Sequence, residues 1–445
     1  MNEDDVRCAE TSPLVDVDTR SAEAPQASST ICGRARQSGI LPYQKRRCKY
    51  KFVILRVVLN PRTSSLLTLA FTMLLAASAA SAQAPAAPPA SDAVTALQLA
   101  AMNGDLKGIA SAVDAKVPLD ALGDSHMTAL GIASMYGRLD ALRALLKAGA
   151  SVAVDQDGES ILAVAAHEGH TDVLDALIAA GADINAKNKD GISPLMVAAG
   201  SNRVAAVRAL VAKGADVNAT NNDGATALIA AAYGGYAQST DALLASGAKT
   251  DVRDRTGRTA LMASALGGNA AVTSLLLEHK ADPLVEDNND MNALVYAAST
   301  GQDEVVSVLR KAGVTRGADL ALAFAVRGCR LPLANSLLAG GASIDADLNG
   351  DHLLILAVGA NCREGVEMLL AKGMNIDKQN DEGMTALMRA AGEGYADLVE
   401  LLLAKGADME KQNQNNQSAW LFAAMANHPD IVELLRANRE ARQKK

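Results

Sequence analysis

The sequence is short of aromatic residues. Phe, Trp and Tyr make up 3% of the 445 residues, with one Trp and four Phe, whereas there are 14 Met and many Ala and Leu. A large globular core normally uses big aromatic side chains to fill volume, so this composition argues against one. Small helix-forming residues favour thin, closely stacked helices instead. The apolar share of 49% also excludes a chain that is disordered throughout.

The motifs that usually carry catalysis are missing from residue 93 onward. There is no glycine-rich phosphate loop, no G-x-S-x-G elbow and no CxxC pair. The six His of the chain are scattered and form no recognisable triad. We therefore predict a protein that is not an enzyme and needs no cofactor.

Two short patterns resemble metal sites but lack an essential feature. His167 and His170 are three residues apart and flank a Gly, whereas a zincin helix needs two His four apart on one face. The segment from Asp345 to Gly350 has the spacing of the first half of a calcium loop. Leu356 then stands where that loop needs a bidentate Glu. We predict no metal site at either place.

Long apolar runs are also rare, and residues 66–82 form the one that matters. This run follows a basic segment (46–62) and ends in Ala80-Ser81-Ala82, which is the layout of a secretory signal peptide. We expect cleavage before Gln83, with an uncleaved membrane anchor as the alternative. Residues 1–65 show no helix or strand period and are expected to be a disordered leader or a mis-assigned start. Residues 83–92 are expected to be an Ala/Pro linker.

The charge is unevenly distributed along the chain. Residues 1–82 carry a net charge of +4, so the remaining residues carry −12 of the total of −8. An acidic domain repels phosphate backbones, which makes nucleic acid an improbable partner. The membrane is expected to be contacted only through the apolar segment, if that segment is not cleaved.

One internal period dominates residues 93–438. A Leu in phrases such as T-A-L, T-P-L or S-I-L recurs every 32 or 33 residues, with a single interval of 28, and we number positions in each repeat from this Leu as slot 0. A Gly then stands at slot 19 in eight of the nine repeats from the second to the tenth, where a helix end in the left-handed conformation would require it. Slot 0 is occupied by Leu97, Leu130, Leu162, Leu195, Leu228, Leu261, Leu294, Leu322, Leu354, Leu387 and finally Trp420.

Each unit contains two apolar stripes at helical spacing, separated by a glycine break and followed by a polar turn such as NAKNKDG (185–191). One such helix–turn–helix unit cannot bury its own apolar faces, but a stack of them forms a continuous core. The period therefore predicts a solenoid of about eleven helical pairs.

The repeated phrases resemble the ankyrin repeat. DGISPLMVAAG (190–200) and DEGMTALMRAAGEGYADLVELLLAKGAD (381–408) follow the family pattern G-x-T-P-L-H-x-A-A…L-L…G-A-D. The resemblance implies an all-α ankyrin-repeat solenoid with inter-repeat β-turn fingers. The family's His after the slot-0 Leu is absent from every repeat, so we expect packing to carry more of the stability. The first and last units depart most from the pattern and look like caps, and 439–445 forms a basic tail.

The interval of 28 residues between Leu294 and Leu322 predicts an interruption. It is five residues short, and the segment between them lacks a polar turn of normal length. We expect a lost or stunted finger near 313–319, a change of stacking angle, and two sub-arrays (93–313 and 318–438) that meet at a weaker interface.

The two cysteines of the repeat region occupy nearly equivalent slots of adjacent repeats. Cys329 lies seven residues after Leu322, and Cys362 lies eight after Leu354. Stacked helices are about 8–10 Å apart, whereas a disulfide needs α-carbons within about 7 Å. A disulfide and a pair of buried free thiols therefore both remain open.

The resemblance also implies a function. Ankyrin arrays hold a protein partner on their turn tips and on the face formed by the ends of the first helices. We therefore predict a monomeric, non-enzymatic, protein-binding scaffold in the periplasm, with a secreted effector or a membrane-anchored scaffold as alternatives. Slots 5 and 6 form an apolar stripe in the first half of the array, which is either a partner site or a row half-buried against neighbouring turns. The predicted partner-binding residues are Met135, Tyr136, His167, Glu168, Tyr233 and Leu266.

Overall fold

The computed structural model describes residues 90–122, 126–153 and 159–443. The chain divides into two units, Met1–Pro85 and Ala86–Lys445, and all described residues belong to the second. The expected leader, the signal segment 66–82 and most of the linker lie outside the described residues. Of the helices that are described, none is both long enough and apolar enough to cross a membrane.

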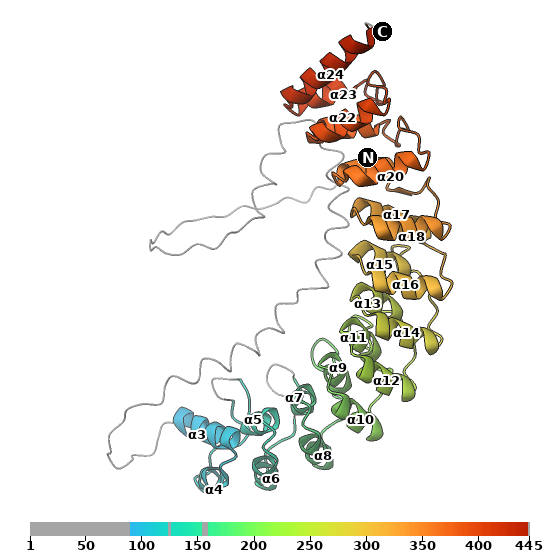
Figure 1. The fold of residues 1–445 in the computed structure, drawn as a ribbon. Helices are drawn as coiled ribbons and strands as arrows, with labels where there is room; N and C mark the ends of the chain where they lie inside the picture. The colour runs from blue at the N-terminus through green and yellow to red at the C-terminus, as the bar shows by residue number, and fades with distance from the viewer. Residues whose placement is uncertain (1–89, 123–125, 154–158, 444–445) are drawn as a thin grey trace, which may run out of the picture. The chain divides into compact units, whose positions relative to one another are not determined.

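The described residues form eleven helical pairs, as the period predicts (Figure 1). The first helices of the pairs are α3 (Ala90–Asn103), α5 (Ala129–Met135), α7 (Ile161–Glu168), α9 (Pro194–Gly200), α11 (Ala227–Tyr233), α13 (Ala260–Leu266), α15 (Ala293–Thr300), α17 (Ala318–Arg327), α19 (Leu353–Gly359), α21 (Ala386–Glu393) and α23 (Ala419–Met425). The second helices are α4 (Leu106–Asp114), α6 (Leu139–Lys147), α8 (Thr171–Ala179), α10 (Val204–Ala212), α12 (Ala237–Ala245), α14 (Ala270–Glu278), α16 (Asp303–Lys311), α18 (Leu331–Ala339), α20 (Arg363–Ala371), α22 (Ala396–Ala404) and α24 (Pro429–Gln443). The all-α repeat fold is confirmed.

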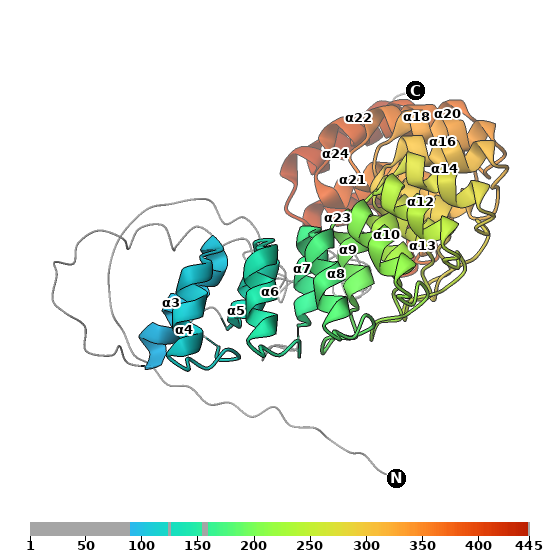
Figure 2. The same cartoon turned by 90° about the horizontal axis from the view of Figure 1, so that it is seen from below.

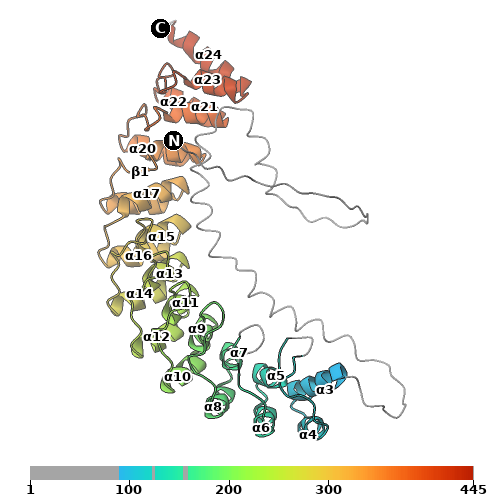
Figure 3. The same cartoon turned by 180° about the vertical axis from the view of Figure 1, so that it is seen from behind.

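The helices form two layers. Each first helix packs on the first helix of the next repeat and on the second helix of its own repeat, and Figures 2 and 3 show the same layers from two other sides. The slot-0 leucines are at most 1% exposed and belong to one continuous apolar core. The core therefore runs along the whole stack instead of gathering at a centre.

Polar side chains fix the start of most first helices. Thr226 is a typical N-cap: its backbone is extended, and its hydroxyl accepts a hydrogen bond from the backbone N–H of Ile229 at 3.3 Å. Such a cap satisfies one of the N–H groups that a helix start leaves without a partner. Equivalent Thr, Ser or Asn caps precede α5, α7, α9, α13, α15 and α21.

Slot 19 follows the second helix in the left-handed conformation in the first ten repeats, as the glycine pattern predicts. Gly214 has φ +94°, and a Cβ placed there would meet nothing within 4 Å. The backbone angle, and not crowding, therefore selects glycine at this slot. Lys280, the one exception in the middle of the array, adopts the same conformation with φ +62°.

The polar fingers are held by side chains that compensate for the missing family His. The Asn188 side-chain oxygen accepts hydrogen bonds from the backbone N–H groups of Asp190 (3.0 Å) and Ile192 (2.9 Å). The fingers also join one another, since the backbone N–H of Asn222 donates to the Asp190 carbonyl of the preceding finger at 2.9 Å. Packing is thus supplemented by a hydrogen-bonded row that the sequence pattern did not reveal. The same side-chain bonds recur at Asn221, Asp254, Asp287, Asn380 and Asn413.

The short interval produces a stunted turn. α16 ends at Lys311, and only a tight turn through Thr315 and Arg316 separates it from α17 at Ala318. The first helices α15 and α17 remain closely packed across this joint. The second helices α16 and α18 make little contact, but so do α18 and α20, and α20 and α22. The predicted loss of the finger is thus seen, while the weaker interface between two sub-arrays stays a prediction.

The ends of the array are more helical than the sequence indicated. α3 begins at Ala90, inside the expected linker, and α24 continues through the expected basic tail to Gln443. Both segments are rich in helix-forming residues, which outweighed the Pro-rich and basic composition beside them.

Candidate functional site

The two tyrosines of the predicted stripe are exposed at the ends of first helices. Tyr136 follows α5 and is 42% exposed, and Tyr233 is the last residue of α11 and is 38% exposed. These rings are partly anchored by the helix that carries them and still offer a large amphipathic surface. Exposed aromatic side chains of this kind are enriched at protein interfaces.

The other predicted residues flank the tyrosines and are less exposed. Met135 and Leu266 are half-buried at the ends of α5 and α13. His167 is exposed at the end of α7, and its Nδ1 lies 2.9 Å from Oε1 of Glu168. The stripe thus combines apolar, aromatic and polar groups, as an adaptable protein-binding surface requires.

The stripe is not continuous. The fourth repeat contributes only Gly200 and Ser201 at the corresponding slots, and neither offers a large side chain. The structure therefore separates the predicted residues into two groups, one on α5 and α7 and the other on α11 and α13. A partner that uses both groups has to bridge the fourth repeat.

A row of hydrogen bonds fixes the backbone behind this stripe, and the sequence analysis missed it. Slot 8, just before each second helix, often holds a side chain that donates to the end of the preceding first helix. Arg203 Nε, for example, donates to the His167 carbonyl at 2.7 Å. The signal in the sequence was a polar or cationic residue at slot 8, usually directly after a Gly or Asn at slot 7. Other examples are Arg138 to Met102, His170 to Met135, Asn269 to Tyr233 and Arg330 to Ala298.

At one junction a covalent bond replaces this hydrogen bond. Cys329 and Cys362 form a disulfide with their α-carbons 5.6 Å apart. Both residues lie in the turns between the two helices of their repeats, not on the helices, so the helix-to-helix spacing does not apply to them. Cys329 is exposed and has φ +54°, whereas Cys362 is buried.

The segment with calcium-loop spacing forms a β-hairpin instead. β1 (Asp347–Leu348) pairs with β2 (Asp351–His352) across a turn in which Asn349 and Gly350 both have positive φ, as a type I′ turn requires. Lys378 Nζ forms an ion pair with Asp345 at 2.8 Å, and Asn380 donates to Asp351 at 2.6 Å. These carboxylates therefore serve the hairpin and the neighbouring finger.

Metal-ligand side chains converge at one place among the described residues, formed by Cys329, Cys362 and Glu364. Because the two sulfurs are bonded to each other there, they are not thiolate ligands. The pair His167 and His170 does not converge either, since His170 Nε2 bonds the Met135 carbonyl.

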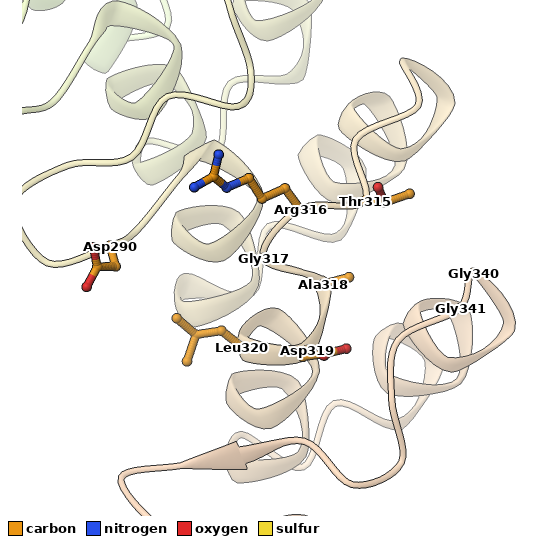
Figure 4. A pocket seen from close by; sticks show the side chains of 9 residues that line it. All are labelled: Asp290, Thr315, Arg316, Gly317, Ala318, Asp319, Leu320, Gly340 and Gly341. Atoms are coloured by element: carbon orange, nitrogen blue, oxygen red, sulfur yellow. The ribbon is translucent and has the colours of Figure 1, made fainter.

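An open hollow of about 700 Å³ lies where the finger is missing (Figure 4). Asp290 bounds one side, Gly340 and Gly341 the other, and residues 315–320 form its floor. Two of its charged groups are already engaged: Arg316 pairs with Glu286 at 2.7 Å, and Asp319 accepts the Ser343 N–H at 2.7 Å. The hollow follows from the shortened turn and offers no convergent set of reactive groups.

The repeats match a known family model, which agrees with the geometry. A search of curated proteins gave no match. Among solved structures, the ankyrin repeat domain of Bcl-3, described as a unique member of the IkappaB protein family, is 26% identical, covers 48% of this chain and 97% of that chain, and has a TM-score of 0.43. The family model for ankyrin repeats in three copies matches residues 97–188, 161–254, 228–322, 322–413 and 354–445. Because these matches together span most of the sequence, the chain belongs to the ankyrin repeat family.

Proposed function

We propose that the array is a non-enzymatic scaffold that binds a protein partner through the first-helix ends of its N-terminal half and works in the periplasm. Ankyrin repeats are protein-interaction scaffolds. The observation that carries the location of the site is the exposure of Tyr136 and Tyr233 at the ends of first helices. Slot-8 hydrogen bonds hold the carbonyls of Tyr233 and of Met135 beside Tyr136, so little backbone freedom is lost when the tyrosines bind.

Substitution of the two tyrosines tests the site. The protein is used to capture its partner from a native periplasmic extract, and affinity is then measured for Tyr136→Ala and Tyr233→Ala. Each change should weaken binding about 30-fold, corresponding to roughly 2 kcal/mol for a central aromatic anchor. The thermal midpoint should hardly change, because both rings are already exposed.

Leu284→Ala is the matched control, since Leu284 is exposed but lies on the loop after α14 and away from the first-helix ends. It should leave binding unchanged. If both tyrosine variants bind normally, or if both unfold the array, the stripe is structural and the partner site lies on the finger tips.

Two features support a location outside the cytoplasm. The apolar segment 66–82 ends in the small residues Ala80-Ser81-Ala82, as a signal peptide does. The disulfide between Cys329 and Cys362 suits an oxidising compartment, because cytosolic thiols are normally kept reduced. Export before folding would allow this bond to form as the repeats stack.

Fractionation and N-terminal sequencing test the location. A mature protein that begins at Gln83 in the periplasmic fraction is the expected result. Recovery of the intact chain in the membrane fraction would instead establish a membrane-anchored scaffold. Release into the medium would establish a secreted effector.

A further inference from the structure

Two slots of the first helix face the following repeat. Residues at slots 0 and 4 are at most 1% exposed in each of the first ten repeats, whether they are Leu, Ala, Ser or Val. In the eleventh repeat the same slots hold Trp420, which is 48% exposed, and Ala424, which is also exposed. The change shows that these slots are buried by the next repeat, because among the described residues no repeat follows the eleventh.

The slot before the Leu faces the preceding repeat. From the second to the eleventh repeat this slot is buried and holds Ala at most positions, for example Ala227 and Ala419 at 1% exposure. In the first repeat the corresponding Ala96 is exposed, and Leu99 on the same helix is 46% exposed. Slot 2, which Leu99 occupies, is half-buried or buried in the other repeats.

The two ends of the stack are therefore the two halves of one interface. The face of α3 with Ala96 and Leu99 corresponds to the face with which every interior repeat contacts the repeat before it. The face of α23 with Trp420 and Ala424 corresponds to the face with which every interior repeat contacts the repeat after it. A capping repeat that keeps an array soluble and separate normally has a polar outer face. α24 does expose charged residues such as Arg436, but the first-helix faces at the two ends expose the apolar side chains of Leu99 and Trp420.

We propose that the chain associates head to tail, with the α23 face of one copy docking on the α3 face of a second copy. The docking continues the inter-repeat interface already present ten times within the chain. In most of these interfaces, the first helix of the preceding repeat packs against a small Ala at the slot before the Leu. Ala96 is the same residue type at the same slot. Such an interface is heterologous, so one dimer still has both faces free and can grow into linear oligomers or close into a ring.

We expect dilute protein to be monomeric, as the sequence analysis predicts, because association at these two faces has to offset the loss of rigid-body freedom. Sedimentation velocity of the full chain over a concentration series should show dimers and then larger species. Trp420 is the only Trp of the chain, so its emission reports on this face directly. Its emission should shift to shorter wavelength as concentration rises. A blue-shifted emission that does not depend on concentration would mean that another part of the same chain covers Trp420, and it would overturn the proposal.

Two blocked variants define the geometry. Leu99→Arg blocks the α3 face, Ala424→Arg blocks the α23 face, and Leu284→Arg is the matched control on an exposed Leu of the middle of the array. Each blocked variant alone should stay monomeric, because each lacks one half of the interface. An equimolar mixture of the two should form dimers and stop there, since only one pair of intact faces remains.

Circular dichroism should show an unchanged fold for all three variants, because the substituted side chains are exposed. The control should associate like the unmodified chain. Association that persists in both blocked variants alone would trace to another surface, such as the apolar segment 66–82, and would overturn the proposal. Dimers of Leu99→Arg alone would point to two α23 faces meeting symmetrically and would overturn it as well.

Discussion

Loss of the disulfide between Cys329 and Cys362 should destabilise the C-terminal half of the array by a predictable amount. The bond closes a loop with a sequence separation of 33, for which chain entropy gives about 3.7 kcal/mol. Cys362→Ser should therefore lower the free energy of unfolding by about that amount. It also leaves Cys329 in a left-handed conformation that a residue with a side chain adopts only at a cost.

Cys329→Gly should be less harmful than Cys362→Ser, although both remove the same bond. Glycine relieves the backbone strain at φ +54°, which is of order 1–2 kcal/mol. The greater freedom of glycine in the unfolded chain offsets about 0.4–1 kcal/mol of that gain. The single variants should thus differ by roughly 0.5–1 kcal/mol.

The neighbouring junction suggests a repair. There Gly301 and Arg330 occupy the slots of the two cysteines, and Arg330 Nη1 donates to the Ala298 carbonyl at 2.9 Å. The double variant Cys329→Gly/Cys362→Arg copies this pair and should recover about 1 kcal/mol or more of the loss, since one partner of the hydrogen bond is charged.

Urea unfolding followed by circular dichroism measures these differences. A reductant should lower the stability of the unmodified chain to the level of Cys362→Ser and should leave the three variants unchanged. The reasoning fails if the reductant has no effect on the unmodified chain. It also fails if the double variant is no more stable than Cys362→Ser.

Two other predictions concern the joint and the hairpin. Amides at 313–319 should exchange with solvent faster than those at the junctions with complete fingers, because the shortened turn leaves only side-chain links such as Arg316–Glu286 in the place of a finger; equal exchange would show that the packing of α15 on α17 is sufficient. Burial lowers the pKa of His352 in the folded chain below its usual value. As pH falls, the unfolded chain therefore binds a proton before the folded chain does. The stability that His352 contributes above its unfolded pKa of about 6.5 is lost as pH falls from that value toward the folded pKa. His352→Thr, which restores the usual cap residue, should lose less stability between pH 7.5 and pH 5.5 in thermal unfolding, and an identical loss in both proteins would contradict this origin.

The period of the sequence was sufficient to predict the fold because every repeat has to meet the same physical requirements at the same slots. Slot 0 must be apolar, and the residue at slot 19 must adopt positive φ, so both are visible at fixed spacing. The lost finger near 313–319 was visible for the same reason, as a deficit of five residues. Lys280 shows the limit of this reasoning, since it adopts the glycine conformation without being a glycine.

Features that depend on the exact position of a turn could not be predicted. The slots of Cys329 and Cys362 indicated stacked helices, whereas the residues lie in turns that approach more closely than helices do. The hydrogen bonds of Arg203 and its equivalents also depend on which carbonyl lies beside slot 8. The interruption of the stripe at Gly200 and Ser201 was present in the sequence, but only the stack shows that it separates two groups. Whether these groups bind a partner stays a prediction.

The covalent link between the eighth and ninth repeats changes how the chain responds to mechanical tension. In a stack of independent units, pulling on the two ends releases the full extended length of every repeat that opens. The disulfide holds back the chain between Cys329 and Cys362, whose sequence separation of 33 would otherwise add about 110 Å of extended chain. Under tension, the oxidised protein therefore reaches a shorter maximum extension than the reduced protein. The redox state of the compartment thus sets how far the scaffold can stretch.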